Sequence, residues 1–126
     1  MKAPFAHILC VEDNESLAHL MRRVLAPAGV EITHALSGEQ ALDLVRQRRY
    51  DLVTLNIRLP GISGFEVCHR LKHDPDLCAI PVLFCSGETN QEFIDQAYQL
   101  GAVDYLTKPY GIDDFRERVL AQLHQL

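Results

Sequence analysis

The feature that most constrains the fold is an alternation between short apolar runs and segments with helical spacing. Three runs are almost wholly apolar: Ile8–Val11, Leu52–Leu55 and Val82–Cys85. Continuous apolar character is typical of central strands in a parallel sheet that helices cover on both faces. Residues 30–35 alternate apolar and polar side chains, and residues 102–106 are short and mixed. These two segments are therefore predicted to be edge strands.

Helical spacing separates the predicted strands. The first helix is predicted from an apolar stripe at the i, i+3, i+4, i+7 and i+8 positions, formed by Leu17, Leu20, Met21, Val24 and Leu25. Capping boxes predict the starts of three more helices, at Ser37 with Gln40, Ser63 with Glu66, and Thr89 with Glu92. A last helix is predicted from about Asp113, with an apolar stripe of Phe115, Val119, Leu123 and Leu126.

Five strand–helix units in 126 residues predict an α/β fold. We expect a doubly wound, five-stranded parallel sheet of strand order 2-1-3-4-5, a flavodoxin-like (βα)5 architecture. No internal repeat or Ser/Gly-rich linker divides the sequence, so residues 1–126 are predicted to form a single domain. Because the last apolar stripe reaches Leu126 without a cap, we expect this domain to have been excised from a longer chain.

Composition narrows the function. The 12 basic and 17 acidic side chains give a formal charge of −5, which argues against direct binding of nucleic acid. Residues 1–11 fit neither a secretory signal nor a membrane span. The four cysteines, at positions 10, 68, 78 and 85, lack the spacing of a metal site or a disulfide scaffold. We therefore expect a cytoplasmic protein with no membrane partner.

Polar side chains follow four of the five predicted strands. Glu12 and Asp13 follow the first strand, Asn56 the third, Ser86 the fourth and Lys108 the fifth. In a sheet of this type the carboxyl ends of the strands form the binding site. Paired carboxylates suit Mg²⁺, and a lysine beside a hydroxyl suits a phosphoryl group. The rim thus favours phosphoryl transfer, although the central Asn56 is a poor nucleophile.

Four stretches resemble the receiver domain of two-component response regulators, including chemotaxis-type receivers. They are ILCVEDN at 8–14, DLVTLNIRLPGISG at 51–64, PVLFCSG at 81–87 and GAVDYLTKP at 101–109. The stretches occur in the family's order and at its distances, and the resemblance covers essentially the whole chain. It implies the fold predicted above and a role in phosphorelay signal transduction.

The resemblance also implies a metal site. Glu12 and Asp13 match the acidic pair that holds Mg²⁺, and Arg58 matches the position whose backbone carbonyl completes the site together with the acceptor position, here Asn56. It further implies roles for four residues outside the metal site. These are Ser86 and Lys108 as phosphoryl contacts, Tyr105 as the aromatic switch, and Pro109 on a cis peptide bond.

Asn56 departs from the family pattern. The family has an Asp here, which a histidine kinase phosphorylates, and an asparagine amide cannot form the acyl phosphate. An Asp carboxylate ~4 Å from a unit positive charge attracts it by about 4 kcal/mol at an effective dielectric of about 20, before desolvation, and Asn56 lacks this attraction. If only a third of this energy remains after other effects offset it, the loss lowers Mg²⁺ affinity roughly tenfold. We expect a weakly filled or empty metal site, with Arg58 or Lys108 folded over Glu12 and Asp13.

Three functions stay open. The first is a phosphorylation-independent pseudo-receiver that binds a protein, with Asn56 biasing one state of a two-state domain. The second is an ordinary phosphoacceptor receiver in which Asp was replaced by Asn experimentally. The third is an enzyme of the same topology, which is disfavoured because neither an Asp-x-Asp motif nor a phosphate-binding loop follows the first strand. We expect no catalytic residues and no enzyme activity.

The resemblance implies a signalling surface on the fourth helix, fifth strand and fifth helix. Its candidate residues are Gln91, Asp95, Gln99, Tyr105, Tyr110 and Asp113. The implied partners are a histidine kinase or phosphotransfer protein, an output domain or effector, and a second copy of the chain.

Other polar clusters have simpler interpretations. His69 and His73 share a helix face at a metal-binding spacing, but their charged neighbours favour a solvated face. Three arginines follow the second helical segment, at positions 46, 48 and 49. We interpret them as stabilising the carboxyl end of that helix rather than as binding nucleic acid. His34, on an edge strand, is assigned no role.

Overall fold

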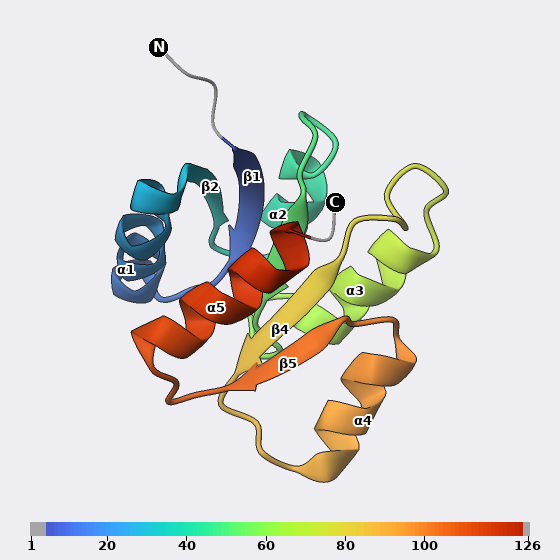
Figure 1. The fold of residues 1–126 in the computed structure, drawn as a ribbon. Helices are drawn as coiled ribbons and strands as arrows, with labels where there is room; N and C mark the ends of the chain where they lie inside the picture. Colours follow the sequence, from blue (N-terminus) through green and yellow to red (C-terminus); the bar gives the residue numbers. More distant parts are fainter. Residues whose placement is uncertain (1–4, 125–126) are drawn as a thin grey trace.

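The computed structural model describes residues 5–124. Five parallel strands form one sheet in the order β2-β1-β3-β4-β5 (Figure 1). The strands are β1 (Ala6–Val11), β2 (Val30–Ala35), β3 (Leu52–Leu55), β4 (Val82–Ser86) and β5 (Asp104–Thr107). The helices are α1 (Glu15–Leu25), α2 (Gly38–Leu44), α3 (Gly64–Lys72), α4 (Gln91–Gln99) and α5 (Ile112–Leu123), with a 3₁₀ turn, η1 (Ala26–Ala28). The predicted fold class and strand order are confirmed.

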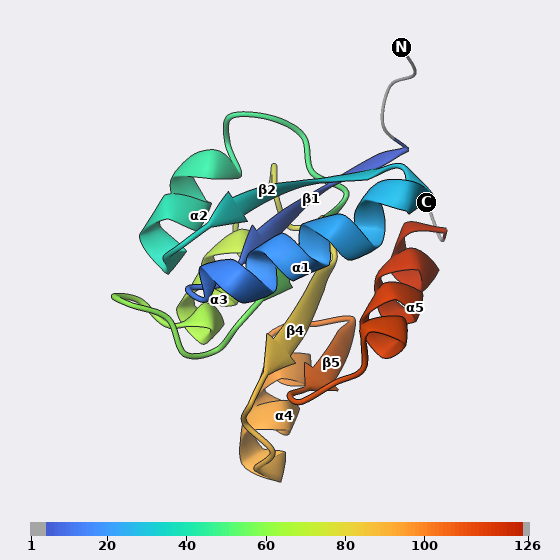
Figure 2. The ribbon, with the colours of Figure 1, turned by 90° about the vertical axis from the view of Figure 1, so that its left-hand side faces the viewer.

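The helices cover both faces of the sheet. Helices α1 and α5 pack on one face, and α2, α3 and α4 pack on the other (Figures 1 and 2). Every residue of the three central strands β1, β3 and β4 is buried, which explains their continuous apolar runs. The edge strand β2 alternates more exposed and buried positions, as its sequence predicts.

Two helix starts match their predicted caps and one does not. The hydroxyls of Ser37 and Ser63 accept hydrogen bonds from the backbone N–H groups three residues on, as predicted. The prediction of Thr89 as the cap of α4 is wrong. The cap is Asn90, whose side chain accepts the N–H of Glu92 at 2.8 Å, because an asparagine one residue nearer the helix satisfies the same orphan donor.

Two further helix predictions need correction. Leu20 is 40% exposed and does not belong to the buried face of α1. That face contains Met21 and Leu25, as predicted, and also Ala18. Helix α2 ends at Leu44 with Val45 as its C-cap, so the three arginines at 46, 48 and 49 lie beyond the helix, in the α2–β3 loop. The last turn of α2 therefore contains none of the three arginines.

The last helix follows its predicted stripe as far as it is described. Phe115, Val119 and Leu123 are buried, and α5 ends at Leu123 with His124 as its C-cap. Leu126, the last residue of the predicted stripe, lies outside the described residues. Between residues 5 and 124, no helix is both long enough and apolar enough to cross a membrane.

Candidate functional site at the carboxyl ends of the strands

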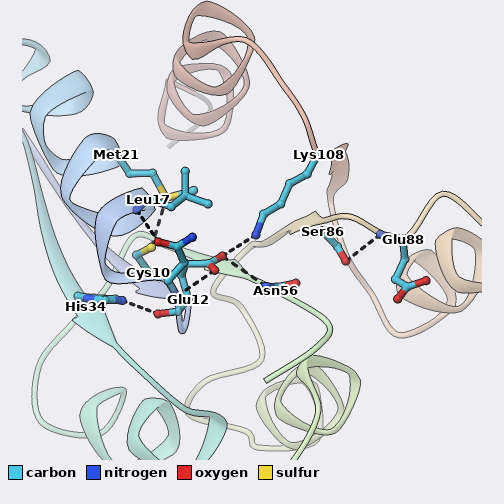
Figure 3. A network of polar contacts seen from close by, with 10 residues as sticks. Cys10, Glu12, Leu17, Met21, His34, Asn56, Ser86, Glu88 and Lys108 are labelled. Carbon is cyan, nitrogen blue, oxygen red and sulfur yellow. Dashed lines mark hydrogen bonds and ion pairs between the residues drawn. The ribbon is translucent and has the colours of Figure 1, made fainter. Parts of the chain in front are cut away.

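The predicted polar rim forms where the strands end. Glu12 directly follows β1, Asn56 directly follows β3, and Lys108 directly follows β5. Figure 3 shows Glu12, Asn56 and Lys108 converging, with Lys108 reaching across from the far strand. Residues far apart in the sequence therefore meet as the parallel topology requires.

Glu12 is the centre of this group. It is 2% exposed, and both of its carboxylate oxygens accept hydrogen bonds. Oε1 accepts the backbone N–H of Asn14 at 3.2 Å, while Oε2 accepts the Lys108 ammonium at 2.9 Å and the Asn56 amide at 3.4 Å (Figure 3). A buried carboxylate is tolerated because it is paired and hydrogen-bonded in this way.

The backbone of Asn56 is held against the start of α3. A Cβ placed on Gly64 would lie 2.0 Å from the Asn56 carbonyl oxygen, so this position admits only glycine without a backbone shift. The Gly64 N–H donates to the Ile57 carbonyl at 2.8 Å. The acceptor position is thus fixed by close packing of α3 on the end of β3.

Ser86 belongs to a second polar group on the rim. Its buried hydroxyl accepts the backbone N–H of Glu88 at 3.3 Å, and this group is displaced from Glu12 and Lys108 in Figure 3. Tyr105 is 7% exposed and donates its hydroxyl hydrogen to the Glu88 carbonyl at 2.7 Å. Burial raises the pKa of Tyr105. Tyr105, the predicted switch residue, is therefore turned inward and bonded to the β4–α4 loop.

Arg58 and Lys108 form ion pairs with different carboxylates. The Arg58 guanidinium forms an ion pair with Glu88 and does not pair with Glu12. Of the two cations that we expected over the acidic pair, Lys108 alone contacts it, through Glu12. Asp13 is exposed at the rim. The Arg58–Glu88 pair joins the loops that follow β3 and β4.

His34 and Glu88 are the site residues that the sequence did not indicate. The Nε2 of His34 lies 2.5 Å from the carbonyl oxygen of Glu12, a contact between the ends of β2 and β1 (Figure 3). In the register of these strands His34 pairs with Cys10, so a known register would have placed its side chain near the rim. No sequence signal marks Glu88.

The donor chemistry at the rim fits Mg²⁺ in part. The Glu12 and Asp13 carboxylates and the Arg58 carbonyl are oxygen ligands of the kind that Mg²⁺ prefers. The Lys108 ammonium already occupies Glu12 Oε2, however, so a cation must compete with it. Within residues 5–124, no group of three or more His, Cys, Asp and Glu side chains is placed to hold a metal ion.

The structure also tests the predictions for the His69–His73 pair and for Pro109. The His69 and His73 rings lie 4.0 Å apart and are exposed at the carboxyl end of α3, where His73 is the C-cap. The described residues supply no third ligand there. The Lys108–Pro109 peptide bond is cis, as the resemblance implies.

The candidate signalling surface is exposed except at its two tyrosines. Gln91, Asp95, Gln99 and Asp113 are exposed on α4 and α5. Tyr105 is buried, and Tyr110 is half-buried with its ring stacked 5.8 Å from that of Phe115. Packing against the core thus removes both aromatic rings from the freely accessible part of this surface.

Comparisons with known proteins agree with the geometry. The response regulator DivK of Brucella anthropi is 34% identical over 92% of this chain and 94% of its own length. The chemotaxis response regulator CheY4 of Vibrio cholerae superposes with a TM-score of 0.87 at 25% identity, over 93% of this chain and 98% of its own. The Mn²⁺-bound form of the response regulator Rcp1 superposes with a TM-score of 0.81 at 29% identity, over 92% and 90% of the two chains.

Other relatives are longer proteins. The chain spans only 26–52% of the length of five curated relatives, several of them transcriptional regulators. The family model described as the response regulator receiver domain matches residues 8–120. Together with the strand order and the polar rim, this match means that the chain belongs to the receiver domain family of two-component signalling.

Proposed function

We propose that this receiver domain is a protein-binding switch that works without phosphorylation at its acceptor position. Asn56 carries the proposal. Its amide stands directly after β3, 9% exposed, where it donates toward Glu12 Oε2. An amide there provides no carboxylate oxygen for an acyl phosphate. Receiver domains are typically signalling modules rather than enzymes, which agrees with this assignment.

The contacts around Asn56 support a fixed conformation. The Lys108 ammonium pairs with Glu12 in place of a phosphoryl group, and the Tyr105 hydroxyl is bonded inward to the Glu88 carbonyl. Both contacts form without a covalent modification. A partner that recognises this arrangement would bind the unmodified chain.

A second candidate is an ordinary phosphoacceptor receiver in which Asp was replaced by Asn. It is favoured by the rest of the site, which retains the acidic pair, Ser86, Lys108 and the cis Pro109. Under this hypothesis the single change Asn56→Asp restores a complete phosphorylation site.

Intact mass spectrometry after incubation with acetyl phosphate and Mg²⁺ tests both candidates. We expect the unmodified chain to gain no phosphoryl group and Asn56→Asp to gain one, mapped to position 56. Asn56→Ala is the matched control, because it removes the amide without supplying a carboxylate. A phosphoryl group retained on a rim residue of the unmodified chain would overturn the first candidate. Failure of Asn56→Asp to be modified would overturn the second.

The Asn56→Asp variant also tests whether the rim binds a metal ion. The related response regulator Rcp1 has an Mn²⁺-bound form, which supports binding of a divalent cation by this chain. The protein ligands that we propose are Glu12, Asp13 and the Arg58 carbonyl. Asn56→Asp is expected to bind Mg²⁺ about tenfold more tightly than the unmodified chain, because it adds one negative charge beside the cation. Thermal unfolding at increasing MgCl₂ reports this difference, since a ligand that binds the native state raises its stability.

The binding surface that we propose consists of α4, β5 and α5. Gln91, Asp95, Gln99 and Asp113 are the exposed polar residues to alter first. A histidine kinase, a phosphotransfer protein, an output domain or effector, or a second copy of the chain is the proposed partner. Alanine variants at these positions should reduce recovery of the partner from lysate of the native cell, and unchanged recovery would contradict the choice of surface.

A further inference from the structure

A cavity lies at the end of the sheet opposite Asn56. It has a volume of about 660 Å³ and is lined by residues of the α2–β3 loop and the α3–β4 loop. These loops precede β3 and β4, so the cavity is at the amino ends of those strands, whereas Asn56 follows the carboxyl end of β3. Figure 1 shows the two loops projecting side by side beyond the top of the sheet. The cavity is therefore distinct from the candidate phosphoryl site.

The cavity has an apolar wall formed by core residues. Val45 and Leu77 are buried at 2% and 9% exposure, and Ile80 and Pro81 line the cavity beside them. The volume is in the range of small-molecule pockets, about 300–1,000 Å³. A flat apolar group is the kind of ligand that this wall can cover.

Basic and acidic side chains both line the cavity. They are three arginines and two aspartates. Arg46 is held by an ion pair with Asp74. Arg48 and Arg49 are exposed, and neither forms an ion pair with a described residue.

Among the described residues, the two aspartates that line the cavity form no ion pair with these guanidiniums. Asp51 accepts the backbone N–H of His7 at 2.9 Å, and Asp76 is exposed on the opposite loop. Arg48 and Arg49 are therefore available to an anion that enters the cavity, where charge-assisted hydrogen bonds to a planar acidic group are strong.

Tyr50 closes the inner side of the cavity. This residue lines the cavity and is only 3% exposed. Its ring is fixed edge-on against His7, with the ring centroids 5.3 Å apart. The cavity therefore has an aromatic lining residue that packing holds in place.

We propose that this cavity binds a small amphipathic anion, a molecule with a flat apolar ring system and an acidic group. The ring system packs on Val45, Ile80 and Pro81, and the acidic group pairs with Arg48 and Arg49. The proposal concerns different residues from the phosphoacceptor rim and does not rest on the function proposed for Asn56.

Two dyes that differ by one charge test the proposal. The anionic probe is 1-anilinonaphthalene-8-sulfonate, and the neutral probe is N-phenyl-1-naphthylamine, which has the same rings without the sulfonate. Fluorescence titration of the folded chain should give saturable binding of the anionic probe. The double variant Arg48→Gln/Arg49→Gln should weaken that binding at least about tenfold and leave the neutral probe nearly unaffected, because it removes both proposed charge-assisted contacts.

The matched control is Arg22→Gln/Arg23→Gln, which removes the same charge from exposed positions on α1. This control should bind the anionic probe like the unmodified chain. A third variant, Ala79→Phe, places a large ring at an exposed position of the cavity lining and should reduce binding of both probes. Circular dichroism must show that each variant is folded before its titration is interpreted.

Several results would overturn the proposal. They are the absence of saturable binding, equal loss of affinity in the two double-arginine variants, or full binding by folded Ala79→Phe. Amide chemical shifts locate the probe independently. Shifts concentrated in residues 45–51 and 76–81 support the cavity, and shifts concentrated at the carboxyl ends of the strands contradict it.

Discussion

His7 is an ionisable residue buried within the sheet. It is 5% exposed, and its Nε2 lies 2.7 Å from the Thr33 hydroxyl, while Nδ1 has no hydrogen-bond partner. Burial lowers the pKa of His7 below its ordinary value of 6.5, and Arg48 lowers it further; Glu31 and Asp51 act in the opposite direction. The neutral form is therefore the one that the folded state favours.

This environment predicts a loss of stability in mild acid. Below pH 6.5 the unfolded chain binds a proton at His7 that the folded chain does not yet bind, so the free energy of unfolding falls. The loss begins as the pH drops through 6.5 and is complete below the lowered pKa of the folded state. Urea unfolding of the unmodified chain and His7→Gln, from about pH 7.5 to pH 5, should show a shallower decline for the variant.

His19, exposed on α1, provides the control for this measurement. His19→Gln should keep the pH dependence of the unmodified chain. Parallel curves for the unmodified chain and His7→Gln would show that protonation of His7 is not coupled to folding.

At the scale of elements, the β4–α4 loop is the junction between the polar rim and the proposed binding surface of α4, β5 and α5. Glu88 in this loop donates its N–H to Ser86, accepts the Tyr105 hydroxyl through its carbonyl, and pairs through its carboxylate with Arg58. Three elements therefore meet at one residue. Arg58 is 74% exposed, so the ion pair contributes little, and the buried Tyr105 contact is the stronger constraint.

Tyr105→Phe should weaken this junction. It removes the 2.7 Å bond to the Glu88 carbonyl and leaves that carbonyl without its phenol donor. The expected cost is about 0.5–1.5 kcal/mol in the free energy of unfolding, measured by urea denaturation.

Tyr98→Phe is the comparison for this prediction. Tyr98 is 46% exposed, and its hydroxyl is 3.4 Å from Asp104, so its removal should change stability by less than about 0.5 kcal/mol. Equal costs for the two variants would contradict the assigned role of Tyr105.

At the scale of the whole molecule, one sheet separates two apolar cores. Cys10 and Cys85 lie in the core beneath α1 and α5, and Cys68 lies in the core beneath α3. Burial raises the pKa of Cys10 to about 11 and raises that of Cys85 and Cys68 as well. Cys78 is exposed in the α3–β4 loop. The thiolate is the reactive form, so the three buried thiols should be inert in the folded state.

Alkylation with iodoacetamide therefore reports on cooperative unfolding. The folded chain should gain one adduct, at Cys78, and Cys78→Ser should gain none. With increasing urea, the three buried thiols should become reactive over a single transition, as expected if both cores unfold together in one domain. Separate transitions for Cys68 and for Cys10 with Cys85 would mean that the two faces of the sheet unfold independently.

Much of this protein follows from its sequence. Apolar runs and helical spacing predicted the five strands, their order and the helices, because buried faces require those periods wherever the chain packs. Motif order indicated the receiver family, and the family model agrees. The strand ends also predicted that Glu12, Asn56 and Lys108 share one rim, since parallel strands bring their carboxyl ends to the same edge.

Tertiary structure decided which of these side chains contact one another. Lys108 pairs with Glu12 although the two are 96 positions apart, and Arg58 pairs with Glu88 instead. The inward position of Tyr105 and the cavity beside the α2–β3 loop likewise depend on the packing of loops from separate elements. Periodicity encodes which face of an element is buried, but a long polar side chain chooses among several partners according to distance and burial, and those are set only when the elements have packed.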